Sequence, residues 1–159
     1  MSFQTLTLEI DNHVATITLN RPEMMNAFSE QLIWEMGEAT KMVKDDSQIR
    51  ILVITGEGRG FTAGADLSER DASWSDTKDA LERGYYPFLK NIIDMPKPVI
   101  GSINGAAAGI GAAVAMACDL RIMAKEAYIM SVFSNIALVP DGGLSFLLTR
   151  EIGYSRALE

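Results

Sequence analysis

The stretch "NGAAAGIGAAVAMACD" (104–119) places glycines at 105, 109 and 111 in a run of small apolar residues that ends at Asp119. It directly follows "PVIGSIN" (98–104), an apolar run that we expect to form a buried strand, and its own composition favours a helix. Glycines between a strand and a helix let backbone N–H groups come very close to another group, because no side chain holds it away. The stretch therefore predicts a close backbone approach, either to a ligand or to a packed neighbour.

A dinucleotide is one ligand that such a stretch can bind. Residues 105–111 have the G-x-x-x-G-x-G spacing of the cofactor loop in short-chain dehydrogenases. In those enzymes the loop belongs to the first strand–helix unit, and a Tyr-x-x-x-Lys pair follows far downstream. Here the loop begins at residue 105, and the pair Tyr86 and Lys90 precedes it. We therefore do not expect a nicotinamide cofactor, and tight packing of a helix on a sheet remains the simpler alternative.

Composition narrows the possible classes of function. The chain has 159 residues, 48% of them hydrophobic, which suits one domain spanning 1–159. A net charge of −7 without a basic stripe argues against a nucleic-acid partner. Cys118 and His13 are the only residues of their types, so we expect no metal site and assign His13 to a surface turn. The N-terminus does not resemble a signal peptide and 104–119 is too short to cross a bilayer, so we expect no membrane partner and a cytoplasmic location.

Apolar periodicity places the elements of the first half of the chain. "TLTLEI" (5–10) and "VATITLN" (14–20) alternate apolar and polar residues around a polar turn, which predicts a β-hairpin. An apolar stripe predicts a helix from Ser29, its N-cap, to about Asp45. "RILVIT" (50–55) is apolar on both faces, as expected of a strand buried on both sides. The stripe consists of Leu32, Met36, Ala39, Met42 and Val43.

The second half continues the alternation of helices and strands. A stripe from Leu81 to Ile93 predicts a helix with a kink or break near Pro87. Two short strands, "DLRIMA" (119–124) and "AYIMS" (127–131), precede a helix over 143–153 that should end at Gly153. The order of elements predicts a mixed α/β fold. "GYSRALE" (153–159) looks like the start of a further helix, so we expect a chain truncated at its C-terminal end.

A second strand end repeats the opening theme. "RILVITGEGRGFTAGADL" (50–67) runs from a strand through glycines to Ala65, where we expect a helical turn, and it belongs to a long loop (56–76) of the kind that is often functional. Two backbone N–H groups at such junctions can converge on one acceptor. A preorganised pair of donors is an oxyanion hole, and each donor contributes about 3–4 kcal/mol to transition-state stabilisation.

Four motifs in this order and spacing resemble the crotonase, or enoyl-CoA hydratase/isomerase, superfamily, and the resemblance extends from about residue 5 to the last residue. They are "LNRPEMMNAF", "GFTAGADL", "KPVIGSINGAAAGIGAAVAMACDLRIMA" and "ALVPDGGLSFLL". The resemblance implies a spiral of ββα units led by a β-hairpin, with the C-terminal helical part mostly absent here. It also implies an acyl-coenzyme A thioester as substrate, a role in fatty-acid metabolism, no separate cofactor, and assembly as a homotrimer or a dimer of trimers.

The resemblance also assigns residues to the site. The backbone amides of Ala65 and Ile110 would hold the thioester carbonyl, and the helix beginning at Ile110 would favour an enolate oxygen at its positive end. The further residues expected to contact the substrate are Met24, Met25, Ala63, Gly64, Asp66, Leu67, Gly109 and Phe133.

Asp66 has a purely structural alternative, because a carboxylate at the start of a helix more often caps that helix than takes part in chemistry. The net charge of −7 also fits poorly with a ligand that carries several phosphates. Arg21 or Lys97 could compensate locally, and the sequence does not distinguish between them.

The reaction depends on which acids are present. Family hydratases use two glutamates, and this chain has Ala113 and Phe133 at the two positions, three residues after Ile110 and eight before Asp141. Neither replacement can transfer a proton, so hydration is not expected. Asp141, in "VPDGGL", is in a good turn sequence, but some family isomerases carry their catalytic acid at this position. Its apolar neighbours should raise its pKa toward the range useful for proton transfer.

We therefore expect an acyl-CoA isomerase, acting on enoyl-CoA or ring-derived thioesters, with Asp141 as the acid and base. Three alternatives stay open: an enoyl-CoA hydratase-like enzyme, an enzyme with Asp141 as a nucleophile, as in a haloaryl-CoA dehalogenase of the family, and a non-catalytic acyl-CoA-binding subunit. Trp34 and Trp74 could line an acyl pocket or an interface. Cys118 is expected to be a small buried residue beside a helix end.

Overall fold

The computed structural model describes residues 3–69 and 73–158. The predicted hairpin is confirmed: β1 (Leu6–Asp11) pairs antiparallel with β2 (Val14–Leu19). Asn12 and His13 form the two-residue turn with φ of 47° and 69°, the left-handed values that such hairpins require. His13 is exposed, as expected, and its ring Nδ1 lies 2.7 Å from the carbonyl oxygen of Gln48.

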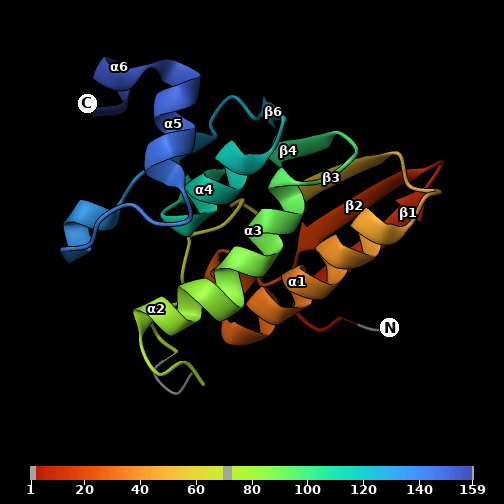
Figure 1. The fold of residues 1–159 in the computed structure, drawn as a ribbon, viewed down its shortest axis with the longest axis horizontal. Helices are drawn as coiled ribbons and strands as arrows, with labels where there is room; N and C mark the ends of the chain where they lie inside the picture. The colour runs from red at the N-terminus through yellow and green to blue at the C-terminus, as the bar shows by residue number, and fades with distance from the viewer. Residues whose placement is uncertain (1–2, 70–72, 159) are drawn as a thin grey trace.

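The hairpin starts a mixed sheet of order β1-β2-β3-β4-β6, which Figure 1 shows behind the helices. Strands β2, β3 (Ile51–Gly56), β4 (Val99–Ile103) and β6 (Leu120–Met123) are parallel. A separate two-stranded sheet joins β5 (Ala106–Ala108) to β7 (Tyr128–Met130). β5 was not predicted, since three alanines carry no strand signal, and it forms because β7 pairs with it.

The helices begin and end close to the predicted positions. α1 (Glu30–Asp45) starts where the Ser29 side chain accepts a hydrogen bond from the Leu32 N–H, so Ser29 is the N-cap. α4 (Ile110–Ala117) follows Gly109, and α5 (Leu144–Ile152) ends at Gly153. The remaining short elements are η1 (Pro22–Met24), α2 (Thr77–Asp79), η3 (Phe133–Ile136) and α6 (Tyr154–Leu158).

The disruption expected at Pro87 takes an unusual form. The chain stays helical from α2 through a π-helical segment, η2 (Ala80–Tyr85), into α3 (Tyr86–Ile93). The Tyr86 N–H donates to the Leu81 carbonyl, five residues back, and Pro87 then occupies the first turn of α3. The wider turn accommodates the proline without a break, because the change in hydrogen-bond pattern occurs just before the residue that lacks an N–H.

The core lies between the sheet and the helices, with α1 and α3 on the same side of the sheet (Figure 1). β3 buries Leu52 and Ile54 completely but leaves Ile51 and Val53 partly exposed, so the expectation of a strand buried on both faces is wrong. The methionine stripe of α1 is core except for Met42, which is 43% exposed.

Cys118, after the last residue of α4, is buried as expected, and burial raises the pKa of its thiol to about 12. No helix among the described residues is both long enough and apolar enough to cross a bilayer. Across 3–69 and 73–158, no three His, Cys, Asp or Glu side chains gather into a potential metal site.

Candidate active site

The two glycine-rich strand ends pack directly against each other. Thr62 forms an isolated bridge with Ala107, and its carbonyl accepts the Ala108 N–H at 3.0 Å. Gly64 has a φ of +93°, and a Cβ placed on it would lie 2.7 Å from the Ala108 oxygen and 3.6 Å from the Ile110 nitrogen. Only glycine allows this approach, so the close backbone contact predicted from the sequence occurs between two parts of the chain.

The packing alternative for the small residues is therefore also correct. A Cβ at Gly111 would lie 2.5 Å from Cγ2 of Thr62, and one at Gly105 would lie 2.1 Å from the Arg59 oxygen. The glycines bring β5 and α4 against the loop that follows β3. Close packing and a possible ligand site are consequences of the same contact.

The N–H groups of Ala65 and Ile110 differ from those of their neighbours. Gly64 donates to Oγ1 of Thr62 at 3.2 Å, and Gly109 donates to the Met130 carbonyl at 3.1 Å. Within residues 3–69 and 73–158, neither Ala65 nor Ile110 donates its backbone N–H to a protein acceptor. Backbone donors in folded proteins rarely lack a partner, so both N–H groups are available to a ligand.

The local structure around Ala65 differs from the expectation. Residues 66–69 form a hydrogen-bonded turn, in which the Glu69 N–H reaches the Asp66 carbonyl at 3.4 Å, and no helix begins there. Instead, a bridge between Ala65 and Phe28 holds the segment, with the Asp66 N–H donating to the Phe28 carbonyl at 3.0 Å. Ile110 is the first residue of α4, as predicted, so a helix N-terminus contributes at one donor only.

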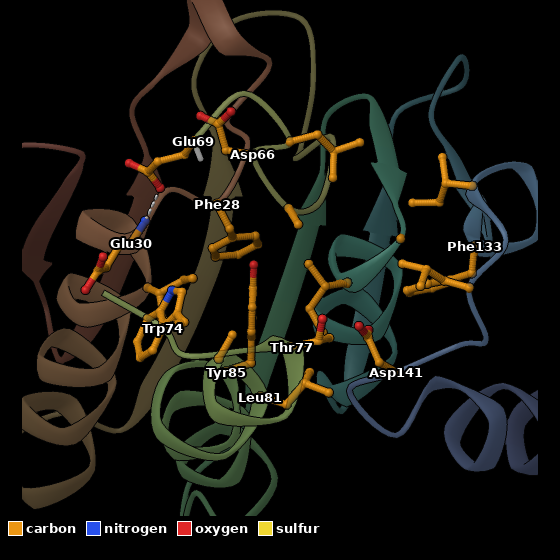
Figure 2. Close-up of a pocket in the computed structure, with 18 of the residues that line it drawn as sticks. Phe28, Glu30, Asp66, Glu69, Trp74, Thr77, Leu81, Tyr85, Phe133 and Asp141 are labelled. Carbon is orange, nitrogen blue, oxygen red and sulfur yellow. Dashed lines mark hydrogen bonds between the residues drawn. The ribbon is translucent and has the colours of Figure 1, made fainter. Parts of the chain in front are cut away.

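Both donors open into one cavity of about 500 Å³ (Figure 2). The cavity brings together most of the predicted site residues: Ala63, Ala65, Asp66, Leu67, Gly109, Ile110, Phe133 and Asp141. Met24, Met25 and Gly64 do not line it. Met25 supports the neighbouring loop, since its carbonyl accepts the Ala63 N–H at 2.9 Å, whereas Met24 is 39% exposed.

Asp141 reaches the cavity from the turn before α5 (Figure 2). Its Oδ1 is buried and has no hydrogen-bond partner among the described residues. Burial raises the pKa of this carboxyl, although a hydrogen bond from its own backbone N–H partly offsets the effect. The result is a partly buried acid that holds its proton more readily than an ordinary aspartic acid.

Gly142 fixes this turn against the donor at Ile110. Its φ is +57°, and a Cβ there would lie 2.4 Å from Cδ1 of Ile110 and 2.9 Å from Cβ of Ala113. The backbone next to Asp141 therefore packs on the first turn of α4.

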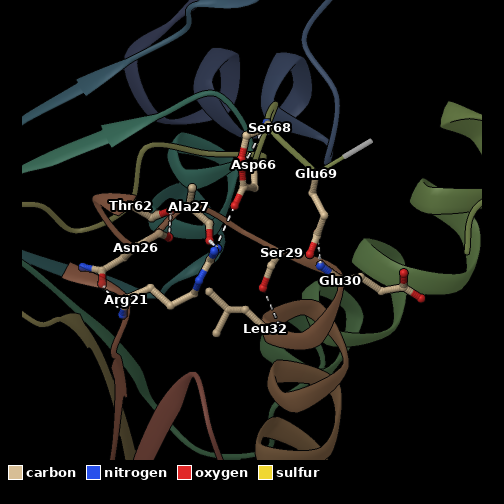
Figure 3. A network of polar contacts seen from close by, with 10 residues as sticks. All are labelled: Arg21, Asn26, Ala27, Ser29, Glu30, Leu32, Thr62, Asp66, Ser68 and Glu69. Atoms are coloured by element: carbon tan, nitrogen blue, oxygen red, sulfur yellow. Dashed lines mark hydrogen bonds and ion pairs between the residues drawn. The ribbon is translucent and has the colours of Figure 1, made fainter. Parts of the chain in front are cut away.

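Asp66 lines the same cavity but is fully engaged, as Figure 3 shows. Its Oδ2 lies 3.0 Å from Nη2 of Arg21, and its Oδ1 accepts from the N–H and hydroxyl of Ser68 at 3.1 and 2.6 Å. Burial alone would raise its pKa, but the bonds from Ser68 and Arg21 outweigh burial and lower the pKa. Asp66 thus caps a turn and forms an ion pair, and it does not cap a helix.

The two cations considered as phosphate partners both have protein partners. Besides Asp66, Arg21 donates from Nη1 to the Ala27 carbonyl at 2.6 Å. Lys97 donates to the carbonyls of Val43 and Asp46 at 2.7 and 2.8 Å, away from the cavity lining. Local charge compensation for a phosphate therefore has no support from these two residues.

Asn26 was not singled out from the sequence, yet it joins the loop before α1 to the loop after β3. Its Nδ2 donates to the carbonyls of Glu57 and Gly60, both at 2.9 Å, and its Oδ1 accepts the Arg21 N–H at 2.9 Å. Its carbonyl accepts the Thr62 hydroxyl at 2.7 Å (Figure 3). Asn26 is fully buried and has a φ of +56°, and neither property can be predicted from a sequence motif alone.

Tyr85, at the end of η2, is the other residue that sequence reasoning missed as part of the site. Tyr85 lies within the predicted apolar stripe from Leu81 to Ile93, and its ring packs in the core, with its centroid 6.0 Å from that of Phe28 at 73°. However, Tyr85 also lines the cavity, and Figure 2 shows its hydroxyl pointing into it.

The two tryptophans pack on each other, and only one of them lines the cavity. Trp74 lines the cavity, whereas Trp34 is 42% exposed and packs on Trp74 with ring centroids 5.3 Å apart. The predicted functional loop 56–76 supplies much of the lining, although residues 70–72 lie outside the described part of the chain.

A hairpin-led parallel sheet with two glycine-rich strand ends meeting at one cavity defines the crotonase fold class. The enoyl-CoA hydratase/isomerase family model matches residues 9–159. The chain belongs to the enoyl-CoA hydratase/isomerase family.

Some individual relatives are named as isomerases and others as hydratases. The chain is 40% identical over 153 residues to 1,2-epoxyphenylacetyl-CoA isomerase from Escherichia coli K12, covering 94% of this chain and 58% of the relative. It is 39% identical over 158 residues to a protein of Rhodobacter capsulatus named as a probable enoyl-CoA hydratase, covering 99% and 61%. A crystal structure of an enoyl-CoA hydratase from Mycobacterium avium subsp. paratuberculosis K-10 superposes with a TM-score of 0.87 at 30% identity, covering 99% and 59%. The chain thus spans about three fifths of the length of these relatives.

Proposed function

We propose that the protein is an acyl-CoA isomerase that moves a double bond in an enoyl-CoA or ring-derived thioester, with Asp141 as its acid and base. One observation carries this proposal: Asp141, whose Oδ1 has no partner among the described residues, lines the same cavity as Ala65 and Ile110, whose N–H groups donate to no acceptor among those residues. The similarity to an acyl-CoA isomerase of Escherichia coli supports the same class of reaction.

The proposed reaction begins when the thioester oxygen accepts hydrogen bonds from the Ala65 and Ile110 N–H groups. The Asp141 carboxylate then removes a proton next to the thioester carbonyl, and the electron pair moves onto the oxygen as an enolate. Two donors aimed at that oxygen stabilise the developing charge, each by about 3–4 kcal/mol. The same carboxyl returns its proton two carbons further along the chain, which completes the shift of the double bond and regenerates the carboxylate.

Hydration would need a second group that transfers protons. Ala113 is fully buried, and Phe133 lines the cavity and is 5% exposed. Both side chains are hydrocarbon, so neither can activate a water or protonate a carbon. A single carboxyl is sufficient for isomerisation, which is why we favour isomerisation over hydration.

The decisive experiment compares Asp141→Asn with the wild type in deuterated water, using 2-enoyl, 3-enoyl and ring-derived acyl-CoA thioesters. We expect the rate of α-proton exchange to fall about 10²- to 10⁴-fold, the usual contribution of a positioned acid or base. Asp94→Asn, the same change on an exposed residue at the end of α3, should leave the exchange rate unchanged. Full exchange in Asp141→Asn, or none in the wild type, would overturn the proposal.

Two further measurements separate these alternatives. With a haloaryl-CoA thioester, an Asp141 nucleophile would displace halide from the ring and leave a covalent aryl ester on the protein, visible by mass spectrometry, and an isomerase would leave none. A non-catalytic subunit would bind the thioesters without exchanging their protons.

We also propose, from family membership, a cytoplasmic homotrimer or dimer of trimers that needs no cofactor beyond its coenzyme A substrate. Light scattering on the full-length protein tests the assembly, and a monomeric mass would contradict it.

A further inference from the structure

The Tyr85 hydroxyl is a polar group in the cavity that the proposed reaction does not use. Tyr85 is 8% exposed, and its hydroxyl has no hydrogen-bond partner among the described residues. Figure 2 shows the hydroxyl below the Phe28 ring, on the same side of the cavity as Asp141. The hydroxyl is not among the buried polar atoms that lack a partner, so it is open to the cavity and available to a ligand atom.

Packing does not explain the hydroxyl. The Tyr85 ring meets Phe28 edge to face, and its centroid lies 6.0 Å from that of Phe88. Phenylalanine would make the same ring contacts. Because the hydroxyl makes no hydrogen bond among the described residues, ring packing alone does not require a tyrosine at this position.

The surroundings restrict what the hydroxyl can do. Burial, with the charges of Asp141, Glu69 and Asp66, raises the pKa of Tyr85 well above its ordinary value. The phenol therefore stays protonated and acts as a hydrogen-bond donor, not as a base. Much of the adjoining wall is hydrocarbon, from Phe28, Ile33, Ala80 and Leu81. An acyl group that displaces water from this wall leaves the hydroxyl facing the acyl group itself.

We propose that the Tyr85 hydroxyl donates a hydrogen bond to an oxygen atom carried by the acyl group, beyond the thioester carbonyl. The preferred substrates are then acyl thioesters with a keto, ether or epoxide oxygen, and plain hydrocarbon enoyl chains bind less well. This specificity rests on the proposed function, since it places the acyl group in the cavity that contains Asp141. The proposed hydrogen bond from Tyr85 affects how tightly the acyl thioester binds, and it takes no part in proton transfer.

The test measures the dissociation constants of hexanoyl-CoA, 4-oxohexanoyl-CoA and 5-oxohexanoyl-CoA by calorimetry on the full-length protein. These saturated probes contain no double bond to be moved. We expect the wild type to bind at least one oxo derivative about three to ten times more tightly than hexanoyl-CoA, the usual effect of one net hydrogen bond. Tyr85→Phe should abolish this preference without weakening hexanoyl-CoA.

Tyr86→Phe is the matched control, because Tyr86 is the next residue, is 59% exposed and does not line the cavity. It should keep the preference. A wild type without the preference, or a Tyr85→Phe variant that keeps it or weakens all three probes equally, would overturn the inference. Failure of the proposed function is distinguishable, because it appears as retained proton exchange in Asp141→Asn, whereas the binding preference is measured without any reaction.

Discussion

Two turns of the molecule, 64–68 and 140–144, each place an aspartate beside the same cavity, and the protein treats the two carboxylates oppositely. The Asp66 side chain is 4% exposed and is held by Arg21 and Ser68, which lower its pKa. Asp141 has a buried oxygen with no partner among the described residues, and burial raises its pKa. The partnered carboxylate stabilises the loop that carries one donor, whereas the unpartnered one keeps its lone pairs available for a proton.

Among the variants of the two turns, Gly142→Ala should cause the largest combined loss of stability and of proton exchange. The new Cβ meets Ile110 at 2.4 Å and occupies a φ of +57°, so the turn must move. Strain at positive φ and overpacking together should cost about 2–4 kcal/mol of unfolding free energy. Urea denaturation and the proton-exchange assay measure the change, and we expect exchange to fall with stability.

Gly143→Ala is the control for this change, because Gly143 has a φ of +79° but its Cβ would meet only Leu147, at 3.9 Å. It should lose stability through backbone strain alone and keep a faster exchange rate than Gly142→Ala. Equal exchange rates in the two variants would show that the contact with Ile110 does not position Asp141.

Asp66→Asn tests the partnered side of the comparison. It leaves Arg21 without its counter-charge but preserves an acceptor for Ser68, so we expect a loss of about 1–3 kcal/mol in unfolding free energy. Chemical denaturation provides the measurement. Asp45→Asn removes an ion pair whose side chains are 69% and 62% exposed, and it should change stability little. A result for Asp66→Asn as small as that for Asp45→Asn would contradict the structural role of Asp66.

Asp141→Asn should not lower the free energy of unfolding, in contrast to Asp66→Asn. At neutral pH the unpartnered carboxylate opposes folding, so its removal should not lower the free energy of unfolding. Reduced stability in Asp141→Asn would mean that the carboxyl has a stabilising partner.

The smallest effect is the pH dependence of stability, which should differ between the two aspartates. The folded pKa of Asp66 lies below 3.8, so its contribution is present above pH 3.8 and is lost as the pH falls through the folded pKa. The folded pKa of Asp141 lies above 3.8, so its penalty is full above the folded pKa and disappears as the pH falls through the folded pKa toward 3.8. Unfolding curves of both variants and the wild type between pH 3 and pH 7 measure this difference, and parallel curves would contradict it.

The comparison also shows what could be predicted from the sequence. The hairpin, the Ser29 cap and the strand–glycine–helix junction at Ile110 depend on neighbouring residues, and each was predicted nearly to its bounds. The position of Asp141 in the cavity was likewise anticipated from its motif.

The rest depends on contacts between distant residues. Arg21 and Asp66 are 45 positions apart, and no local pattern links them. Strand β5 exists only through β7, and the polar end of Tyr85 cannot be distinguished from core by a helical stripe. Met42 shows the converse, since the helical stripe predicts that it is buried and it is 43% exposed in the structure.

The π-helical segment has a consequence for how this cavity can change shape. A π turn is equivalent to an α-helix with one extra residue, so deleting one residue between 80 and 84 would restore plain α geometry. Each residue of an α-helix turns the chain by about 100°. Because Phe88 and Ile92 anchor α3 in the core, the deletion would rotate the helical turns before residue 80 by about this angle. Thr77 and Leu81 would then leave the wall together. Deletion of a single codon would therefore re-line one side of the cavity while Ala65 and Ile110 stay in place.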